Sequence, residues 1–345
     1  MPVKLKVSVL FFAVNFLYCV SLFSQTVYTD SNRIRKTGKT VFIPNNKEQI
    51  YNLKNGKTFI YSKPESFGFI THLPLDAKGI VVTTFKKENI KPLLLIAGAT
   101  LALIPADETV SNGVKQFSEN IHFHSEEEYR DIINLKAGKT NISILKAPKN
   151  LNTAFYQMGQ GFPSLLIGAG LFTYGKIKND YRALSTASQL TETFILMGVG
   201  TQILKRITGR QSPGMGTDET NWHPFPSFKN YQNNTPNFDA FPSGHLATLM
   251  STVTILAENY SEKKYIRPVG YSLIGLVGFS MINNDVHWIS DYPMAIALGY
   301  ICAKQVVKRN RKIAGTISSK KNKVEMSYNF TYAKGSLTPH IICNF

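Results

Sequence analysis

Long stretches without charged side chains occupy the second half of the sequence and constrain its fold more than any other feature. The five stretches are residues 153–175, 183–204, 246–257, 268–284 and 292–303, and Glu192 is their only charged residue. Their lengths and their Leu, Ala, Ile and Met content favour helices over strands. Short or proline-containing connectors separate them. We therefore expect an all-α bundle over residues 153–308.

The first 25 residues have the pattern of a secretory signal peptide. Lys4 and Lys6 form a basic start, residues 7–23 form an apolar run, and small and polar residues follow. We expect cleavage after this segment, which would place the protein in the cell envelope. An uncleaved anchor is the alternative, because the apolar run is near the lower length limit of a membrane span.

The segments between the signal peptide and the bundle are more polar. Residues 26–90 contain short β-like runs, Thr40–Ile43 and Gly79–Thr84, so we expect a small mixed or irregular region without an assigned role. Residues 91–152 begin with a short apolar helix and continue as a polar connector. Within that connector, Ser125–Glu128 matches a capping box and predicts another short helix.

The tetrapeptide Pro242-Ser243-Gly244-His245 opens one of the uncharged stretches. Ser243 is a suitable N-cap, and the first N–H groups of a helix have no acceptor within the helix. Those donors and the helix dipole favour a bound anion, and a histidine there can transfer protons near neutral pH. A serine N-cap followed by an incidental histidine is the structural alternative.

His287 and Asp291 lie four residues apart where the last uncharged stretch begins. On a helix they would share one face. A carboxylate bonded to one imidazole nitrogen fixes the tautomer and leaves the other nitrogen free as a nucleophile. A purely structural His–Asp pair is the alternative reading.

Lys205 follows the stretch 183–204 and precedes Gly209 and Arg210. A lysine at the end of an apolar helix commonly extends its ammonium into water. The functional alternative is a fixed positive charge that binds a phosphate group.

Together, these clusters resemble the signature of the type 2 phosphatidic acid phosphatase (PAP2) and vanadium haloperoxidase superfamily. That signature is a lysine, six residues and Arg-Pro, then Pro-Ser-Gly-His, then Ser-Arg, five residues, histidine, three residues and aspartate. Here Lys205 precedes Ser212-Pro213, the tetrapeptide is unchanged, and Ser280-Met281 precedes His287 and Asp291 at the same spacings. The resemblance covers residues from about 150 to 308 and is specific because order, spacing and helical context agree.

The resemblance implies a PAP2-like helical fold and hydrolysis through a phosphohistidine. It makes His287 the nucleophile, Asp291 the group that orients it, and His245 the proton donor and later the base. The implied phosphate-binding groups are Lys205, Ser243 and the Gly244 N–H. Positioning and charge neutralisation are what phosphoryl transfer requires. The superfamily hydrolyses its substrates without a metal, so the implied cofactor is none.

Two phosphate-binding arginines of the superfamily are replaced here, by Ser212 and Met281. Neither side chain can form the bidentate contacts of a guanidinium. We hypothesise that Arg210 moves into the place vacated at Ser212, and that Asn284 donates a hydrogen bond in place of the second arginine. If neither compensation operates, the protein is a weakly active or non-catalytic envelope module.

The formal net charge of +17 favours anionic partners such as lipid head groups and phosphate esters. The sequence has no zinc-finger spacing or aromatic RNA-binding signature, which argues against nucleic acid as a partner.

Basic residues gather in the connectors 176–182 and 258–267 and in the segment 309–345, which ends in a short β-like tail. These ends lie opposite the three clusters, so the positive-inside rule would place the site outside the cytoplasm in an inner-membrane enzyme with five crossings. The apolar run 92–105 would not cross, because it is too short.

We expect a hydrolase that acts on a phosphorylated lipid such as phosphatidic acid or undecaprenyl diphosphate. A soluble periplasmic or secreted protein that acts on small phosphate esters is the alternative. A haloperoxidase with vanadate in the phosphate place is disfavoured, because vanadate needs the replaced arginines. We expect no metal site, because His122 and His124 beside Glu126–Glu128 indicate a solvated face. The sequence does not indicate an oligomeric state.

Overall fold

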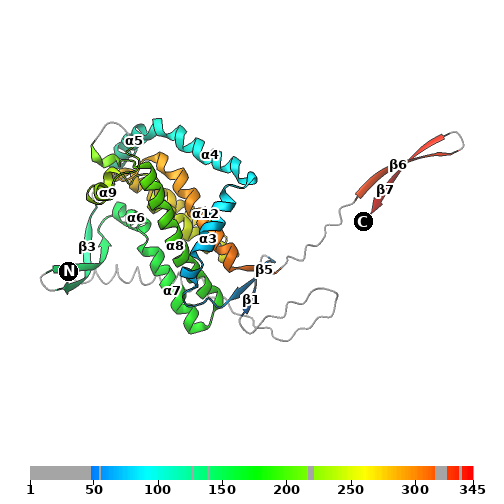
Figure 1. The fold of residues 1–345 in the computed structure, drawn as a ribbon, viewed down its shortest axis with the longest axis horizontal. Helices are drawn as coiled ribbons and strands as arrows, with labels where there is room; N and C mark the ends of the chain where they lie inside the picture. The colour runs from blue at the N-terminus through cyan, green and yellow to red at the C-terminus, as the bar shows by residue number, and fades with distance from the viewer. Residues whose placement is uncertain are drawn as a thin grey trace.

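The computed structural model describes residues 48–53, 56–125, 127–137, 140–216, 221–314, 325–333 and 336–344. The predicted signal peptide and the run Thr40–Ile43 lie outside these residues. Helices dominate the described chain, which confirms the predicted all-α class (Figure 1).

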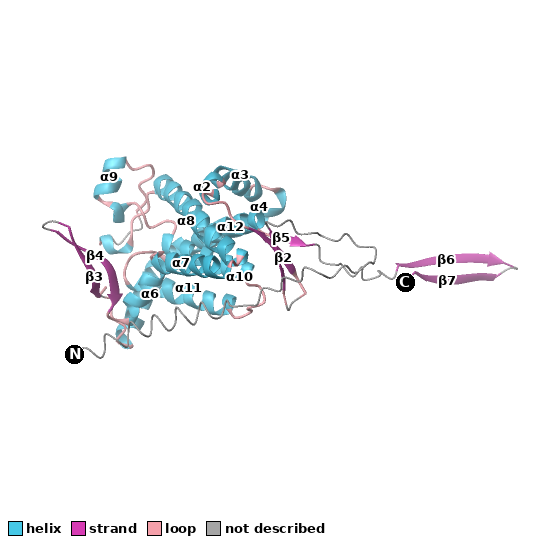
Figure 2. Cartoon of the chain, turned by 90° about the horizontal axis from the view of Figure 1, so that it is seen from below, coloured by secondary structure: helices cyan, strands magenta, loops and turns pink. Residues whose placement is uncertain are grey.

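Most of the long helices form one bundle (Figures 1 and 2). Its helices are α6 (Leu151–Gly159), α7 (Phe162–Lys178), α8 (Tyr181–Thr208), α10 (Gly244–Asn259), α11 (Ile266–Asn283) and α12 (Tyr292–Asn310). Nearly every side chain of α10 is buried, because this helix packs against α8, α11 and α12. A Cβ at Gly299 would lie 2.3 Å from the carbonyl oxygen of Ala247, so glycine is what lets α12 approach α10.

Local sequence signals fix where these helices begin and end. The Asp180 side chain accepts a hydrogen bond from the N–H of Ala183 at 2.9 Å and caps α8. Ser243 caps α10 in the same way, with the N–H of Leu246 as donor. Gly209 ends α8 with a φ of 55°, a left-handed conformation that suits glycine. The helix ends that carry the motifs are therefore set by residues next to the motifs.

The basic ends of the bundle helices carry a small antiparallel sheet. Its strands are β1 (Glu48–Asn52), β2 (Thr58–Ser62) and β5 (Lys312–Ala314), in the order β1-β2-β5. The Tyr51 hydroxyl donates to Asp180 Oδ1 at 2.8 Å, and the Tyr61 hydroxyl donates to Asn259 Oδ1 at 2.8 Å. These bonds attach the sheet to the helix ends that lie away from the three motif clusters.

Two hairpins complete the strands. The first pairs β3 (Tyr129–Ala137) with β4 (Thr140–Pro148), and the second pairs β6 (Glu325–Ala333) with β7 (Ser336–Asn344). The second hairpin is the β-like tail predicted from the sequence. Figure 2 shows the first hairpin and the β1-β2-β5 sheet at opposite ends of the bundle.

Two local predictions before the bundle are wrong. Gly79–Thr84 is not β-like, because it belongs to α3 (Leu73–Thr84), which follows the short α2 (Gly68–Thr71) and packs against α12. There the buried Asp76 accepts from Arg309 at 2.7 Å, and such contacts override strand propensity. Ser125–Glu128 starts no helix at the residues described there, because the Glu128 N–H donates to Thr153 and the chain enters β3.

The apolar run 92–105 is part of a longer helical element than predicted. The helix α4 (Lys87–Leu103) continues through the 3₁₀ turn η1 (Ile104–Ala106) into α5 (Asp107–Asn120). This stretch, Lys87–Asn120, contains an 18-residue window with a mean hydropathy of 1.6 and is, among the described residues, the one helix long and apolar enough to cross a membrane. The apolar run itself is short, and polar residues on both sides continue the same helix.

Candidate active site

The three motif clusters meet where α8 and α11 end and where α10 and α12 begin. The rings of His245 and His287 lie edge to face, with their centroids 5.7 Å apart. His287 is buried, and it precedes the 3₁₀ turn η4 (Ile289–Asp291) rather than lying on a helix. His287 and Asp291 therefore do not share a helix face as predicted. The extended residue Trp288 and the tight turn η4 lie between them.

The orientation of His287 is set by a backbone carbonyl. Its Nδ1 lies 2.8 Å from the oxygen of Ala240 and 3.6 Å from Asp291 Oδ2. A carbonyl oxygen can only accept, so Nδ1 must carry the proton and Nε2 keeps its lone pair. Asp291 Oδ2 accepts from the Trp288 N–H at 2.8 Å, which holds the carboxylate beside the ring. This is the tautomer that a nucleophilic Nε2 needs.

His245 occupies the first turn of α10 and contacts α6. Its ring centroid lies 5.2 Å from that of Tyr156. A Cβ at Gly159 would come within 2.9 Å of the His245 Cβ, so only glycine leaves room for the ring. Burial lowers the pKa of His245 to about 3, and the charges of His287 and Lys205 act in the same direction. The free protein therefore holds this histidine neutral at pH 7.

Lys205 brings a positive charge to both histidines. It is largely buried in the last turn of α8, with Nζ 3.3 Å from Asp239 Oδ2. Burial lowers the pKa of His287 to about 3, and Lys205 is the next largest cause. The carboxylate of Asp239 opposes this shift. The charge of Lys205 therefore acts on both imidazole rings.

Ser243 and Gly244 form the start of α10 beside the histidines. The Ser243 N–H donates to the carbonyl oxygen of Asp291 at 3.4 Å and so joins two motif clusters. A Cβ at Gly244 would meet no heavy atom within 4 Å, so the space in front of this residue is open. The Leu246 N–H is bonded to the Ser243 side chain, so the N–H groups of Gly244 and His245 are the donors that this helix start offers to an anion.

Arg210 is completely buried between two carboxylates. Its Nη2 lies 2.5 Å from Asp107 Oδ2, and its Nη1 lies 2.5 Å from Asp291 Oδ1 and 2.7 Å from Ser290 Oγ. The guanidinium also lies over the ring of Trp222, at 4.7 Å from its centroid. To reach the place vacated at Ser212, Arg210 would have to leave two buried ion pairs, which is costly. In this structure it supports Asp291.

A known family model matches part of the chain. Residues 186–313 match the family model of the PAP2 superfamily. This segment of the chain is similar to the PAP2 superfamily. The matched residues contain all three motif clusters, which confirms the resemblance inferred from them.

Two solved structures are also similar to the chain. The crystal structure of LpxE from Aquifex aeolicus is 21% identical, with 46% of this chain and 83% of that chain covered and a TM-score of 0.34. The transmembrane PAP2-type phosphatidylglycerolphosphate phosphatase from Bacillus subtilis is 16% identical, with 70% and 96% covered and a TM-score of 0.34. No curated protein sequence matches the chain.

The two replaced arginines of the PAP2 signature have different surroundings. Ser212 is almost buried, and its N–H donates to the carbonyl oxygen of Pro236. It caps the 3₁₀ turn η2 (Pro213–Met215), which precedes the short helix α9 (Phe228–Asn233) and the turn η3 (Thr235–Asn237). Met281 is fully buried in the apolar core together with residues of α10 and α12.

Asn284 retains a free donor. Its Oδ1 accepts from Asn152 Nδ2 at 2.5 Å, and Asn152 Oδ1 accepts in turn from Ser280 Oγ at 2.7 Å. The Nδ2 of Asn284 is buried and has no hydrogen-bond partner among the described residues. Asparagine side chains are oriented by their networks, and here the shared bond with Asn152 directs the amide nitrogen away from it. That Asn284 replaces the second arginine of the signature stays a prediction.

Sequence reasoning missed three groups in this candidate site. Asp107 lies on α5, outside the matched segment, and no spacing relates it to the motifs. Asp239 and the Ala240 carbonyl directly precede the Pro-Ser-Gly-His motif, but a carbonyl leaves no signal in a sequence.

Among the described residues, no three His, Cys, Asp or Glu side chains gather in a way that suits a metal ion.

Proposed function

We propose that the protein is a metal-independent phosphatase that hydrolyses phosphate monoesters or diphosphates through a phosphohistidine at His287. One observation carries the proposal. Nδ1 of His287 donates to the Ala240 oxygen at 2.8 Å, which leaves Nε2 of His287 unprotonated, with its lone pair free, and the His287 ring lies beside that of His245. Similarity to the PAP2 superfamily supports phosphatase chemistry for this pair.

In the first step, Nε2 of His287 attacks phosphorus and the bond from phosphorus to the leaving oxygen breaks. His245 protonates that oxygen, so the alcohol or phosphate leaves in its protonated form. In the second step, His245 takes a proton from water and the resulting hydroxide attacks phosphorus. The phosphorus–nitrogen bond breaks, its electron pair returns to Nε2 of His287, and phosphate is released. A bound phosphate dianion would raise the pKa of His245 from its lowered value, because an opposite charge favours the imidazolium.

Groups that the fold holds in place before the substrate binds stabilise the negative charge of the phosphoryl oxygens. Lys205 supplies the cation, and the Ser243 side chain and the Gly244 N–H supply donors at the helix start. Such donors need no rearrangement when charge develops in the transition state. Asp291, 3.6 Å from Nδ1 of His287, stabilises the positive charge that the phosphohistidine carries.

We also propose that the substrate is a phosphorylated lipid and that the active site faces away from the cytoplasm. The outer faces of the bundle helices expose large apolar side chains, among them Phe172, Ile203 and Leu276. Such surfaces favour contact with a membrane, as does the apolar stretch Lys87–Asn120. The basic helix ends lie opposite the active site, and the positive-inside rule assigns basic ends to the cytoplasm.

The test is phosphate release by the full chain in mild detergent with EDTA present. The substrates are phosphatidic acid, undecaprenyl diphosphate and an aryl phosphate, and His287→Ala is the inactive variant. We expect release from a lipid substrate, absent in His287→Ala, and an acid-labile phosphate on His287 after rapid quenching. Lack of release by well-folded protein would favour the non-catalytic module, for which the buried Met281 is the specific observation.

A further inference from the structure

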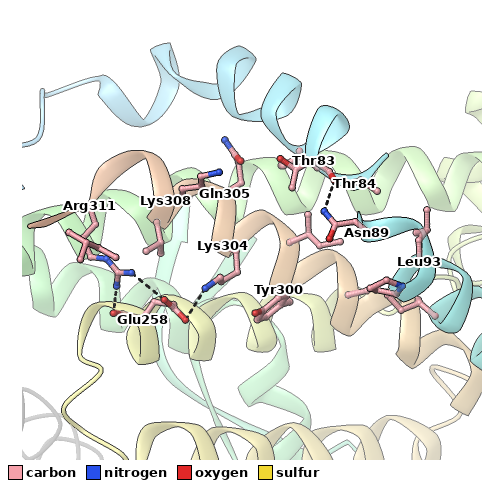
Figure 3. Close-up of a pocket in the computed structure, with 17 residues that line it drawn as sticks. Thr83, Thr84, Asn89, Leu93, Glu258, Tyr300, Lys304, Gln305, Lys308 and Arg311 are labelled. Atoms are coloured by element: carbon pink, nitrogen blue, oxygen red, sulfur yellow. Dashed lines mark hydrogen bonds and ion pairs between the residues drawn. The ribbon is translucent and has the colours of Figure 1, made fainter. Parts of the chain in front are cut away.

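A groove lies far from the histidines. It has a volume of about 610 Å³ and is bounded by α3, α4, α12 and the start of β5 (Figure 3). Its lining residue Lys304 lies on the same helix as the residues that follow Asp291, and at 1.5 Å per residue the two are about 20 Å apart. The groove is therefore separate from the proposed phosphatase site.

The walls of this groove are apolar. Ile80 from α3 and Leu93 and Ile96 from α4 face Ala297 and Ile301 from α12. Its volume is within the range of roughly 300–1,000 Å³ that is usual for small-molecule sites. The wall formed by α4 continues outward into exposed apolar side chains, so the groove opens beside an apolar surface.

One end of the groove is basic. Lys304 Nζ lies 3.2 Å from Glu258 Oε1, and Arg311 Nη2 lies 3.3 Å from Glu258 Oε2 (Figure 3). Arg267 also binds this carboxylate, at 2.9 Å. Lys308 lines the groove, is exposed, and forms no ion pair with another described residue. One carboxylate cannot neutralise these four cations, so this end of the groove carries excess positive charge.

We propose that the groove binds a membrane phospholipid with an anionic head group. An acyl chain lies between α4 and α12 against Leu93 and Ala297, and the head group lies on Lys304 and Lys308. The charge of this end selects an anionic head group, because basic pockets between helices at the cytoplasmic face are suited to such lipids. The apolar stretch that contains α4 brings the open side of the groove to the acyl region of a membrane.

The experiment uses the full chain in nanodiscs that contain equal amounts of phosphatidylglycerol and phosphatidylcholine. In parallel samples, one of the two lipids carries a photoreactive group on its acyl chain, and cross-linked peptides are mapped by mass spectrometry. We expect cross-links to the groove residues of α4 and α12 from phosphatidylglycerol at least fivefold more often than from phosphatidylcholine.

Two variants and a control make the result specific. Lys308→Gln should remove most of the preference for phosphatidylglycerol, whereas Lys264→Gln, an equal charge change at an exposed residue outside the groove, should not. Ala297→Trp should fill the groove and abolish the cross-links there, with an unchanged circular dichroism spectrum to show folding. Equal labelling by both lipids, or labelling unaffected by Ala297→Trp, would overturn the proposal. A dimer that Ala297→Trp dissociates would overturn it too, because a second copy would then be the occupant.

Discussion

Arg210 and Asp107 form an ion pair of 2.5 Å that joins the segment matched by the PAP2 family model to a helix outside it. Both side chains are completely buried, and the other side of the guanidinium holds Asp291. Asp107 also accepts from the N–H and the hydroxyl of Ser290, next to Asp291. The carboxylate of α5 thus fixes the turn that carries the partner of His287.

Replacing Asp107 by Asn should therefore weaken both stability and catalysis. The change leaves Arg210 with one buried carboxylate instead of two, and loss of one partner of a buried pair costs about 3–5 kcal/mol. We expect urea unfolding to show a loss of this order and kcat to fall about 10–100-fold, as for supporting residues around catalytic groups. The neighbouring exposed Glu108→Gln should change neither. If Asp107→Asn lowers stability but leaves kcat and its pH dependence intact, the pair is structural only.

The fold and most of the site could be predicted because their determinants are local. Residues next to each other in the sequence are enough to predict the helix caps Asp180 and Ser243 and the motif around His287. The position of Arg210 could not be predicted, because it depends on Asp107, which reaches it only through the packing of α5 against the bundle. Likewise, Gly79–Thr84 reads as β-like on its own and is helical because α3 packs against α12.

The stability of the folded protein should rise with pH between about 4 and 6.5. The pKa of each active-site histidine is lowered to about 3, so the unfolded chain binds more protons than the folded one in this window. Burial raises the pKa of Asp291 to about 6, which gives a smaller effect of opposite sign. Thermal melts at several pH values should show this slope, and it should shrink in His245→Asn. An unchanged slope in that variant would contradict the assigned protonation states.

Restoring each of the two replaced arginines of the signature should have a different effect on activity and stability. Ser212→Arg restores the arginine that the superfamily signature has at this position and should raise kcat/KM for a phosphate ester about tenfold, because it adds a bidentate donor. Met281→Arg introduces a charge into the apolar core around a fully buried side chain and should lower the free energy of unfolding by several kcal/mol. Steady-state kinetics and urea titrations of both variants separate the effects. A gain of activity in Met281→Arg at unchanged stability would show that this side chain reaches the phosphate.

Lys205 tests whether phosphate lies between the two histidines. Lys205→Gln removes the charge that helps to lower the pKa of both rings, so both pKa values should rise toward their ordinary range. It also removes the one cation proposed to contact the phosphate, so the inhibition constant of inorganic phosphate should increase about 10–100-fold, as for loss of a charged hydrogen bond. Lys229→Gln, an exposed lysine on α9, is the matched control and should change neither quantity. Histidine titration by NMR and phosphate inhibition measure the two effects independently. If the pKa values rise while phosphate binds as before, Lys205 acts on the histidines alone and the anion must be held by the start of α10.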